Sequence, residues 1–294
     1  MTRALLALLL LAPLAACDET TDPGADVAVV VDDAVAARQG GDYARAVSLL
    51  RGALARQPEA AVVRVELATT LLERDGLDLV DLDRIGRFLT ADAGRQPAAR
   101  TAPASRGSAC SLANDPSATP IDPTAAAGFD EVRAYLETLA EAAETLEPVI
   151  PQALQGFDVC TSVADGALVY DRDGAVRELK ARGLSDARVA QALAVYALTQ
   201  FLDAYATVAD GLAEQTSWYR RADGSVAVCV HDEDRAQAIA EAAVADVGGA
   251  VLALDARASI VGPRSVAAEV VALALDAYEQ LRESVGDYCG APQG

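Results

Sequence analysis

The chain has almost no histidine, lysine or aromatic side chains. Its 294 residues include one histidine, His231, and one lysine, Lys180, and only 4% of them are aromatic. Zinc sites are built from clustered Cys and His ligands, and no C-x-x-C spacing is present. The chain also lacks a G-x-S-x-G nucleophile elbow, a Gly-rich phosphate loop and a dinucleotide fingerprint. We therefore expect no catalytic residues, no metal and no cofactor, and a protein that is not an enzyme.

Positive charge is scarce as well. Lys and Arg number 24 against 44 Asp and Glu, which gives a formal net charge of −20. Nucleic-acid binding relies on clustered Lys and Arg that displace counterions from phosphates. The charge balance therefore argues against nucleic acid as a partner.

Only the N-terminal end contains a long hydrophobic run. After Arg3 the chain is apolar from Ala4 to Ala16, apart from Pro13. As a helix this run would span about 20 Å, which is short of the ~30 Å hydrocarbon core of a bilayer. Residues 1–16 therefore have the layout of a secretory signal peptide. Since no later segment reaches eighteen unbroken apolar residues, we expect the remainder to be soluble.

The end of this run, Leu14-Ala15-Ala16-Cys17, resembles the lipobox of bacterial lipoproteins. The alternative is an ordinary signal peptidase cutting after Ala16, although Leu14 is large for the −3 position of such a site. The resemblance implies a diacylglycerol on Cys17, residues 17–26 as a lipidated tether, and attachment to a membrane through the lipid. It also implies a periplasm-facing place in the bacterial cell envelope, on either the inner or the outer membrane.

The number of cysteines fits this assignment. Five is odd, but lipidation of one leaves an even set of four: Cys110, Cys160, Cys229 and Cys289. In an oxidising compartment such a set suggests two disulfides, with three alternative pairings. We favour Cys110 with Cys160 and Cys229 with Cys289, because each bond then closes within one region of the chain. Each would stabilise the fold by roughly 4 kcal/mol. Four buried free thiols or a metal site are the alternative.

Helical periodicity dominates from residue 27 onward and predicts an all-α fold. A first helix should stop at Gly40-Gly41, and a second should open at Asp42 and end before Pro58. A third should run through Val62 and Leu72, and a further one near 80–89.

The stretch GDYARAVSLLRGALARQP resembles the second helix of a tetratricopeptide repeat. The match rests on the Gly41-Asp42-Tyr43 turn, on small Ala46 and Ala53, and on Pro58 closing the helix. Leu67-Ala68 follows Asp33-Ala34 by the 34 residues of that family's period. About one and a half repeats fall within a repeat-like region at 27–92, and the resemblance implies a groove that receives peptide or protein partners. One and a half repeats cannot bury their own apolar face, so we also expect another element to cover it.

The second half of the chain should form a larger helical domain, at 128–290. A Pro-rich linker, 93–127, precedes it and should be a long surface loop. A heptad-like seam from Phe129 to Ile150 favours an intramolecular helical hairpin over an oligomeric coiled coil. Long helices are expected at 186–212, at 232–258 with a weak point at Gly248-Gly249, and at 263–285.

One or two short β-hairpins interrupt these helices. The segments ALVYDRDGAV and SWYRRADGSVAVCV each flank an Asp-Gly pair with β-branched or aromatic residues, which is typical of a tight hairpin turn. The second segment carries the stronger signal. The first could equally be a loop between helices.

His231 has two interpretations. It could serve a catalytic triad if the fold brought it to a serine or cysteine. The alternative is purely structural: the neighbouring Asp232 caps the next helix, and the following acidic residues complement the helix dipole. We favour the cap.

These features predict a lipid-anchored envelope scaffold or adaptor that binds protein partners through a helical-repeat surface. The alternative is a solute-binding or transporter-associated helical lipoprotein of the TRAP type, which would need a pocket between helices lined by convergent arginines. The partner's identity and the oligomeric state are left open.

Overall fold

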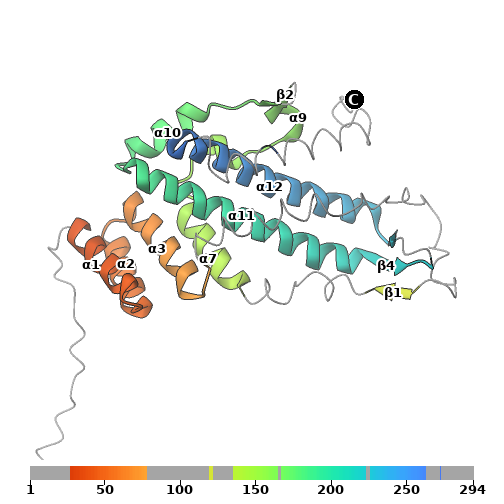
Figure 1. Ribbon diagram of the computed structural model, residues 1–294, viewed down its shortest axis with the longest axis horizontal. Helices are drawn as coiled ribbons and strands as arrows, with labels where there is room; N and C mark the ends of the chain where they lie inside the picture. Colours follow the sequence, from red (N-terminus) through yellow and green to blue (C-terminus); the bar gives the residue numbers. More distant parts are fainter. Residues whose placement is uncertain are drawn as a thin grey trace, which may run out of the picture.

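A computed structural model describes the helices of the chain and their connections (Figure 1). The described residues are 27–77, 119–121, 135–164, 167–222, 226–262 and position 272. Most of them are helical, and the few short strands are antiparallel. This confirms the predicted all-α class with small β-hairpins.

The first three helices follow the sequence signals closely. Helix α1 spans Val27–Gln39, α2 spans Tyr43–Arg56 and α3 spans Ala61–Arg74. Gly41 has φ +80°, a conformation that only glycine adopts without strain, and it separates α1 from α2. The Asp42 carboxylate accepts a hydrogen bond from the Arg45 backbone N–H at 3.1 Å and so caps α2, which begins at the expected place.

Helix α3 is buried on nearly all sides because it belongs to two hydrophobic clusters. One set of its residues faces α1 and α2 in the smaller cluster: Val63, Leu67 and Leu71. Another set faces the larger C-terminal cluster: Ala61, Val65, Ala68 and Leu72. Each set recurs every three or four residues, so the two sets form separate stripes on one helix. The predicted open face of the helical hairpins is therefore covered by the chain itself.

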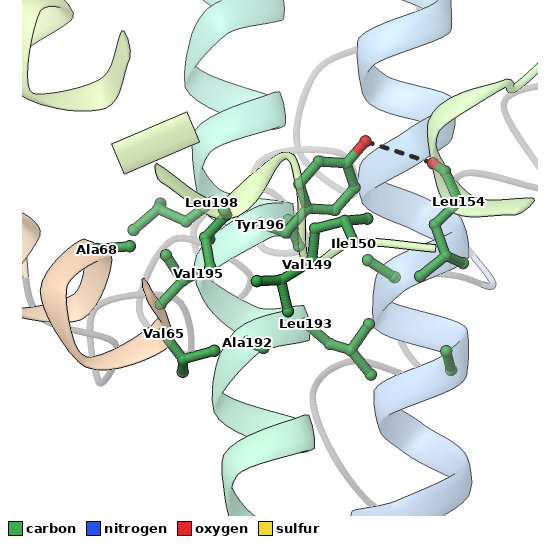
Figure 2. Packing of buried hydrophobic residues seen from close by; sticks show 14 of the residues in the cluster. Val65, Ala68, Val149, Ile150, Leu154, Ala192, Leu193, Val195, Tyr196 and Leu198 are labelled. Atoms are coloured by element: carbon green, nitrogen blue, oxygen red, sulfur yellow. Dashed lines mark hydrogen bonds between the residues drawn. The ribbon is translucent and has the colours of Figure 1, made fainter. Parts of the chain in front are cut away.

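The covering elements are α7, Leu136–Leu146, and the long helix α11, Asp186–Gln215. Both pack against α3. Figure 2 shows Val65 and Ala68 of α3 beside Val195 and Leu198 of α11. The described part of the predicted heptad seam thus packs within the chain, as expected.

A buried ion cluster links these helices. The Glu66 carboxylate of α3 lies 3.0 Å from Nη1 of Arg38 on α1 and also pairs with Arg188 on α11. Arg38 Nε is 3.3 Å from a Glu73 carboxylate oxygen. One turn along α3 and α11, the Gln191 amide donates to the Thr69 hydroxyl at 2.9 Å. A single carboxylate therefore holds arginines from both sides of α3.

The longest helices, α11 and α12 (Glu233–Val261), lie side by side and form the main contact of the molecule (Figure 1). Ser185 caps α11 and Asp232 caps α12, each by accepting from a backbone N–H of the first turn. Over 234–261, α12 is long and apolar enough to cross a membrane by length and composition alone, but 44% of its most apolar window is buried inside the fold.

The predicted weak point at Gly248-Gly249 is wrong, since α12 runs through it without interruption. A Cβ on Gly248 would lie 1.9 Å from the ring of Phe157, and one on Gly249 would lie 3.2 Å from the Leu154 carbonyl oxygen. The pair lets the segment around α8 (Gln152–Gln155) approach the helix axis closely. The Tyr196 hydroxyl donates to that same Leu154 carbonyl at 3.4 Å (Figure 2).

The stronger of the two predicted hairpins is confirmed. Strands β4 (Thr216–Arg220) and β5 (Val226–Val230) pair in antiparallel register, with Thr216 opposite Val230. Strand β1, Thr119–Ile121, adds to the outer edge of β4 and gives the order β1-β4-β5. The segment 93–127, predicted as a loop throughout, therefore contains a short strand.

The Asp-Gly pair of the weaker hairpin signal has a different role. Strands β2 (Val163–Ala164) and β3 (Ala167–Leu168) do pair, but around residues 165–166 rather than Asp173-Gly174. Asp171 instead caps helix α10, Arg172–Ala181, by accepting from the Gly174 N–H at 2.8 Å. An Asp three residues before a backbone N–H serves a helix start as well as a turn, and the local sequence could not distinguish the two.

Some predictions fall outside the described residues. These are the signal peptide, the tether, the helix near 80–89 and nearly all of the helix at 263–285. Helix α12 ends at Val261 and is followed by Gly262, which has a φ of +100°.

The ion cluster gives a first prediction. Replacing the buried carboxylate, Glu66→Gln, should lower the free energy of unfolding by about 3–5 kcal/mol, because it leaves two arginines facing a neutral amide. The matched control is Glu141→Gln, which breaks the exposed pair with Arg51 and should cost about 1 kcal/mol or less. Urea denaturation measures both. Equal losses would contradict a central role for Glu66.

Candidate functional site

The end of the β4–β5 hairpin next to the helices brings three chemically interesting side chains to one face. Ser217 lies directly opposite Cys229 in the strand register, and His231 follows Cys229 by two residues. Positions that are directly opposite, or two apart along an extended strand, share a face of the sheet. The Ser217 hydroxyl oxygen is 2.8 Å from Nε2 of His231. The fold therefore does bring the only histidine to a hydroxyl within hydrogen-bond reach.

This pair meets one requirement of a nucleophile and its base, but not the others. A triad also needs a group that orients the base and donors that stabilise an oxyanion. Among the described residues, no carboxylate accepts a bond from the second ring nitrogen, and the His231 side chain is exposed. The His231 backbone N–H donates to the Gln215 carbonyl at 2.7 Å, so the contact closes the base of the hairpin. The geometry supports a structural role for the pair.

The predicted helix cap beside His231 is confirmed. The Asp232 carboxylate accepts from the Arg235 backbone N–H at 3.0 Å. It thereby satisfies one of the free donors at the start of α12.

The structure describes only some of the predicted cysteine sites. Cys229 is 4% exposed and is disulfide-bonded. Cys160 lies in the short helix α9, Val159–Ser162, but its side chain is outside the described set. The remaining three cysteines, Cys17, Cys110 and Cys289, also lie outside the described residues. Lipidation and the pairing of the disulfides stay predictions.

Converging arginines, which a solute-binding subunit would use for an anion, do occur once in the described part of the chain. Arg38 and Arg188 both point at Glu66. Because the carboxylate of the protein already occupies the space between them, this cluster works as an internal brace.

The pKa of one carboxyl group on α12, that of Asp246, is raised. Burial, reinforced by the charge of Asp203 on α11, raises the pKa of Asp246 on α12 to about 6. Burial, together with the charges of Asp246 and Glu147, also raises the pKa of Tyr196 to about 12. A carboxyl group with this pKa loses its proton between about pH 5 and pH 7.

Sequence reasoning missed the residues that matter most here. Ser217 had no motif around it, and Asp246 was one of 44 acidic residues without a distinguishing neighbour. Only the hairpin register and the packing of α11 on α12 single them out. For Glu66 there was a faint signal, since it is a charged residue within the apolar stripe of a predicted helix.

Comparison with known proteins adds no relative. No protein-family model, no curated protein and no solved structure matches the chain.

The raised pKa of Asp246 predicts a pH-dependent stability. Because the folded-state pKa of about 6 lies above the ordinary value of 3.8, the folded protein holds this proton more tightly than the unfolded chain does. The contribution of Asp246 to the free energy of unfolding should therefore fall as pH rises from about 4 to about 6, and stay low above that.

The test compares Asp246→Asn with the wild-type protein by urea denaturation at several pH values. The variant should gain stability relative to wild type as pH rises from about 4 to 7. Asp32→Asn, on the exposed side of α1, is the control and should show no such trend. A difference between wild type and Asp246→Asn that does not vary with pH would contradict the shifted pKa.

Proposed function

We propose that this protein is a lipid-anchored adaptor of the bacterial cell envelope, which binds a protein partner through the outer face of its first helical hairpin. The anchor is the predicted acylated Cys17, and residues 18–26 form a short polar tether. Helix α1 begins at Val27, immediately after that tether. The partner-binding surface is therefore the part of the fold nearest to the membrane attachment.

The arrangement around α3 carries this proposal. In a helical-repeat array each hairpin buries one face against its neighbour, and the end of the array presents a face that no neighbour covers. Here the inner side of the array is covered by α7 and α11 of the same chain. Among the residues that the structure describes, the end of the array that no helix covers is α1, which lies at their outer edge (Figure 1).

The exposed stripe on α1 has a defined chemistry. Its residues recur with helical spacing, and they are small, apolar or acidic: Ala28, Val29, Asp32, Asp33 and Ala36. Val29 is 55% exposed, the highest value among the large hydrophobic residues that the structure describes as exposed. This surface suits a partner that presents a small apolar contact with basic residues beside it.

The anchor has a direct test. Mass spectrometry of the mature N terminus should find Cys17 as the first residue, with a thioether-linked diacylglycerol. In Cys17→Ser the acyl groups should be lost and the chain should leave the membrane fraction. A wild-type chain that begins with an unmodified Cys17 thiol would contradict the lipid anchor.

The binding surface is tested with a photoreactive amino acid placed at Val29. Val169, which lies before α10 and is 54% exposed, is the matched control. Irradiation of native envelopes should give one dominant protein adduct from position 29 and none of that mass from position 169. Val29→Arg should reduce recovery of the same partner about tenfold, since a central interface residue typically contributes more than 1 kcal/mol. Identical adducts from both positions would contradict the assignment of the surface to α1.

A further inference from the structure

The direction of the backbone groups in the β4–β5 hairpin follows from its register. In an antiparallel pair, every second residue exchanges both backbone hydrogen bonds with the opposite strand, and the residues between them point their N–H and C=O groups outward. The His231 N–H donates to the Gln215 carbonyl, so these two residues form a hydrogen-bonded pair at the base of the hairpin. Two residues further along each strand, Ser217 and Cys229 form the next such pair, and the alternation continues to the tip.

The outer edge of β5 therefore presents unpaired backbone groups. Val226, Val228 and Val230 alternate with the residues that bond to β4, so their N–H and C=O groups point away from that strand. Among the strands that the structure describes, none lies beyond β5 in the order β1-β4-β5. Strand β4 follows the end of α11 and β5 leads into α12, so the hairpin extends past both helices (Figure 1). Such an edge is ready to pair with a further strand.

The opposite edge of the sheet, formed by β1, is closed to further pairing. Thr119 and Ile121 stand opposite Arg220 and Trp218, whose backbone groups point away from β5 and toward β1. Pro120 lies between them and is the residue of β1 that faces outward, but it has no N–H to donate. Proline on an edge strand prevents the addition of another strand. In the described part of the chain, β5 is thus the edge of this sheet that can pair.

A single open edge favours a closed pair of identical chains. Chains with two open edges stack without limit, whereas two chains that contribute one edge each form a two-fold dimer. The sequence of β5 suits this self-pairing, because valine recurs at 226, 228 and 230 and the pattern is the same in both directions. An antiparallel pairing centred on Val228 sets Val226 of each copy opposite Val230 of the other. All three pairs then exchange two backbone hydrogen bonds each.

The charges at the two ends of the hairpin favour the antiparallel orientation. The described residues of the tip include Arg220 and Arg221, whereas the base leads into the acidic start of α12, where Asp232 and Asp234 are exposed. In the antiparallel pairing, the tip of one copy lies two strands across from the base of the other, which is roughly 10 Å. This distance is about the Debye length at 0.1 M salt, so the opposite charges attract. A parallel pairing would set like charges beside each other.

The antiparallel pairing also keeps the acidic helices of the two copies apart. Each hairpin points away from its own long helices, so the two sets of helices lie at opposite ends of the joined sheet (Figure 1). Each chain has a formal net charge of −20. Because the helices are separated by more than a Debye length, most of the repulsion between these charges is screened.

We propose that the outer edge of β5 is an interface for a second copy of this chain. The two copies form one sheet in the order β1-β4-β5-β5-β4-β1, with the two-fold axis at Val228. This interface lies at the opposite end of the described structure from α1, and it does not rest on the proposed adaptor function. The dimer carries its two α1 surfaces at its two far ends.

Sedimentation equilibrium of the full-length mature protein, in a detergent matched to the density of the solvent, tests the association. We expect a monomer–dimer equilibrium that shifts toward the monomer as salt rises from about 0.05 M to about 0.5 M, because screening removes the attraction between tip and base. A protein that stays monomeric up to about 100 µM would overturn the proposal, since no interface weaker than that is specific. An assembly larger than a dimer would overturn it as well.

A charged residue on the edge tests where the interface lies. Val230→Lys sets a lysine level with Arg220 of the second copy, and because Val230 is 37% exposed the change should cost the monomer little stability. The dissociation constant of the dimer should rise at least about tenfold. Val169→Lys is the matched control, at a residue that is 54% exposed and outside the three-stranded sheet, and it should leave the constant unchanged. Equal dimerisation of both variants would contradict the assignment to β5.

An exchange of charges tests the orientation. Arg221→Glu alone and Asp234→Arg alone should each weaken the dimer, because each brings like charges together between tip and base. The double variant should recover much of the loss, since the attraction returns with its signs reversed. A double variant that dimerises more weakly than both single variants would rule out the antiparallel pairing.

Amide hydrogen exchange, resolved by residue, separates a second copy from any other strand on this edge. The amides of Val226, Val228 and Val230 should be protected in the dimer and exchange freely at dilutions where the protein is monomeric. Those of Ala227 and Cys229, which bond to β4, should be protected in both states. Protection of all five in the monomer would mean that the chain covers its own edge, and the proposal would fail. It would fail equally if the valine amides stayed unprotected in the dimer.

Discussion

The arrangement of this fold depends on the buried ion pairs that the Glu66 carboxylate forms with two arginines. The carboxylate is nearly inaccessible to solvent on α3, and it pairs with Arg38 from the N-terminal hairpin and with Arg188 from the long helix α11. Burial of a lone carboxylate would be prohibitive, so α3 can occupy the centre of the fold only if both arginines reach it. The cluster thus links the first three helices to the C-terminal helices through α3.

Close approach between backbones sets the other half of the architecture. Gly248 and Gly249 lack side chains where Phe157 and Leu154 press against α12. This contact holds the segment around α8 and α9 beside the middle of the helix, while the β4–β5 hairpin continues past its start.

The proposed activity fits this division of the molecule. Helix α1 lies at one end of the described structure, whereas the β4–β5 hairpin and the start of α12 lie at the other (Figure 1). Ser217 and His231 meet at the second end, without an orienting carboxylate among the residues that the structure describes. The proposed binding surface on α1 therefore lies apart from the Ser217–His231 pair. Burial, with the charge of Asp203 on α11, raises the pKa of Asp246 on α12 to about 6.

The sequence by itself determined the local features, because these depend on neighbours a few residues apart. The helix period, the helix start at Asp42, the Asp232 cap, the Gly41 turn and the stronger hairpin all followed from the local sequence. The sequence also carries the lipobox-like signal at Cys17, which remains a prediction. Only the tertiary structure decided the rest, since it depends on segments brought together from far apart: the partners of Glu66, the role of Gly248, the Ser217–His231 contact and the pKa of Asp246. The Asp173-Gly174 pair shows where local sequence stops being sufficient. The same local pattern occurs in a turn or at a helix start, and only the surrounding packing selects one.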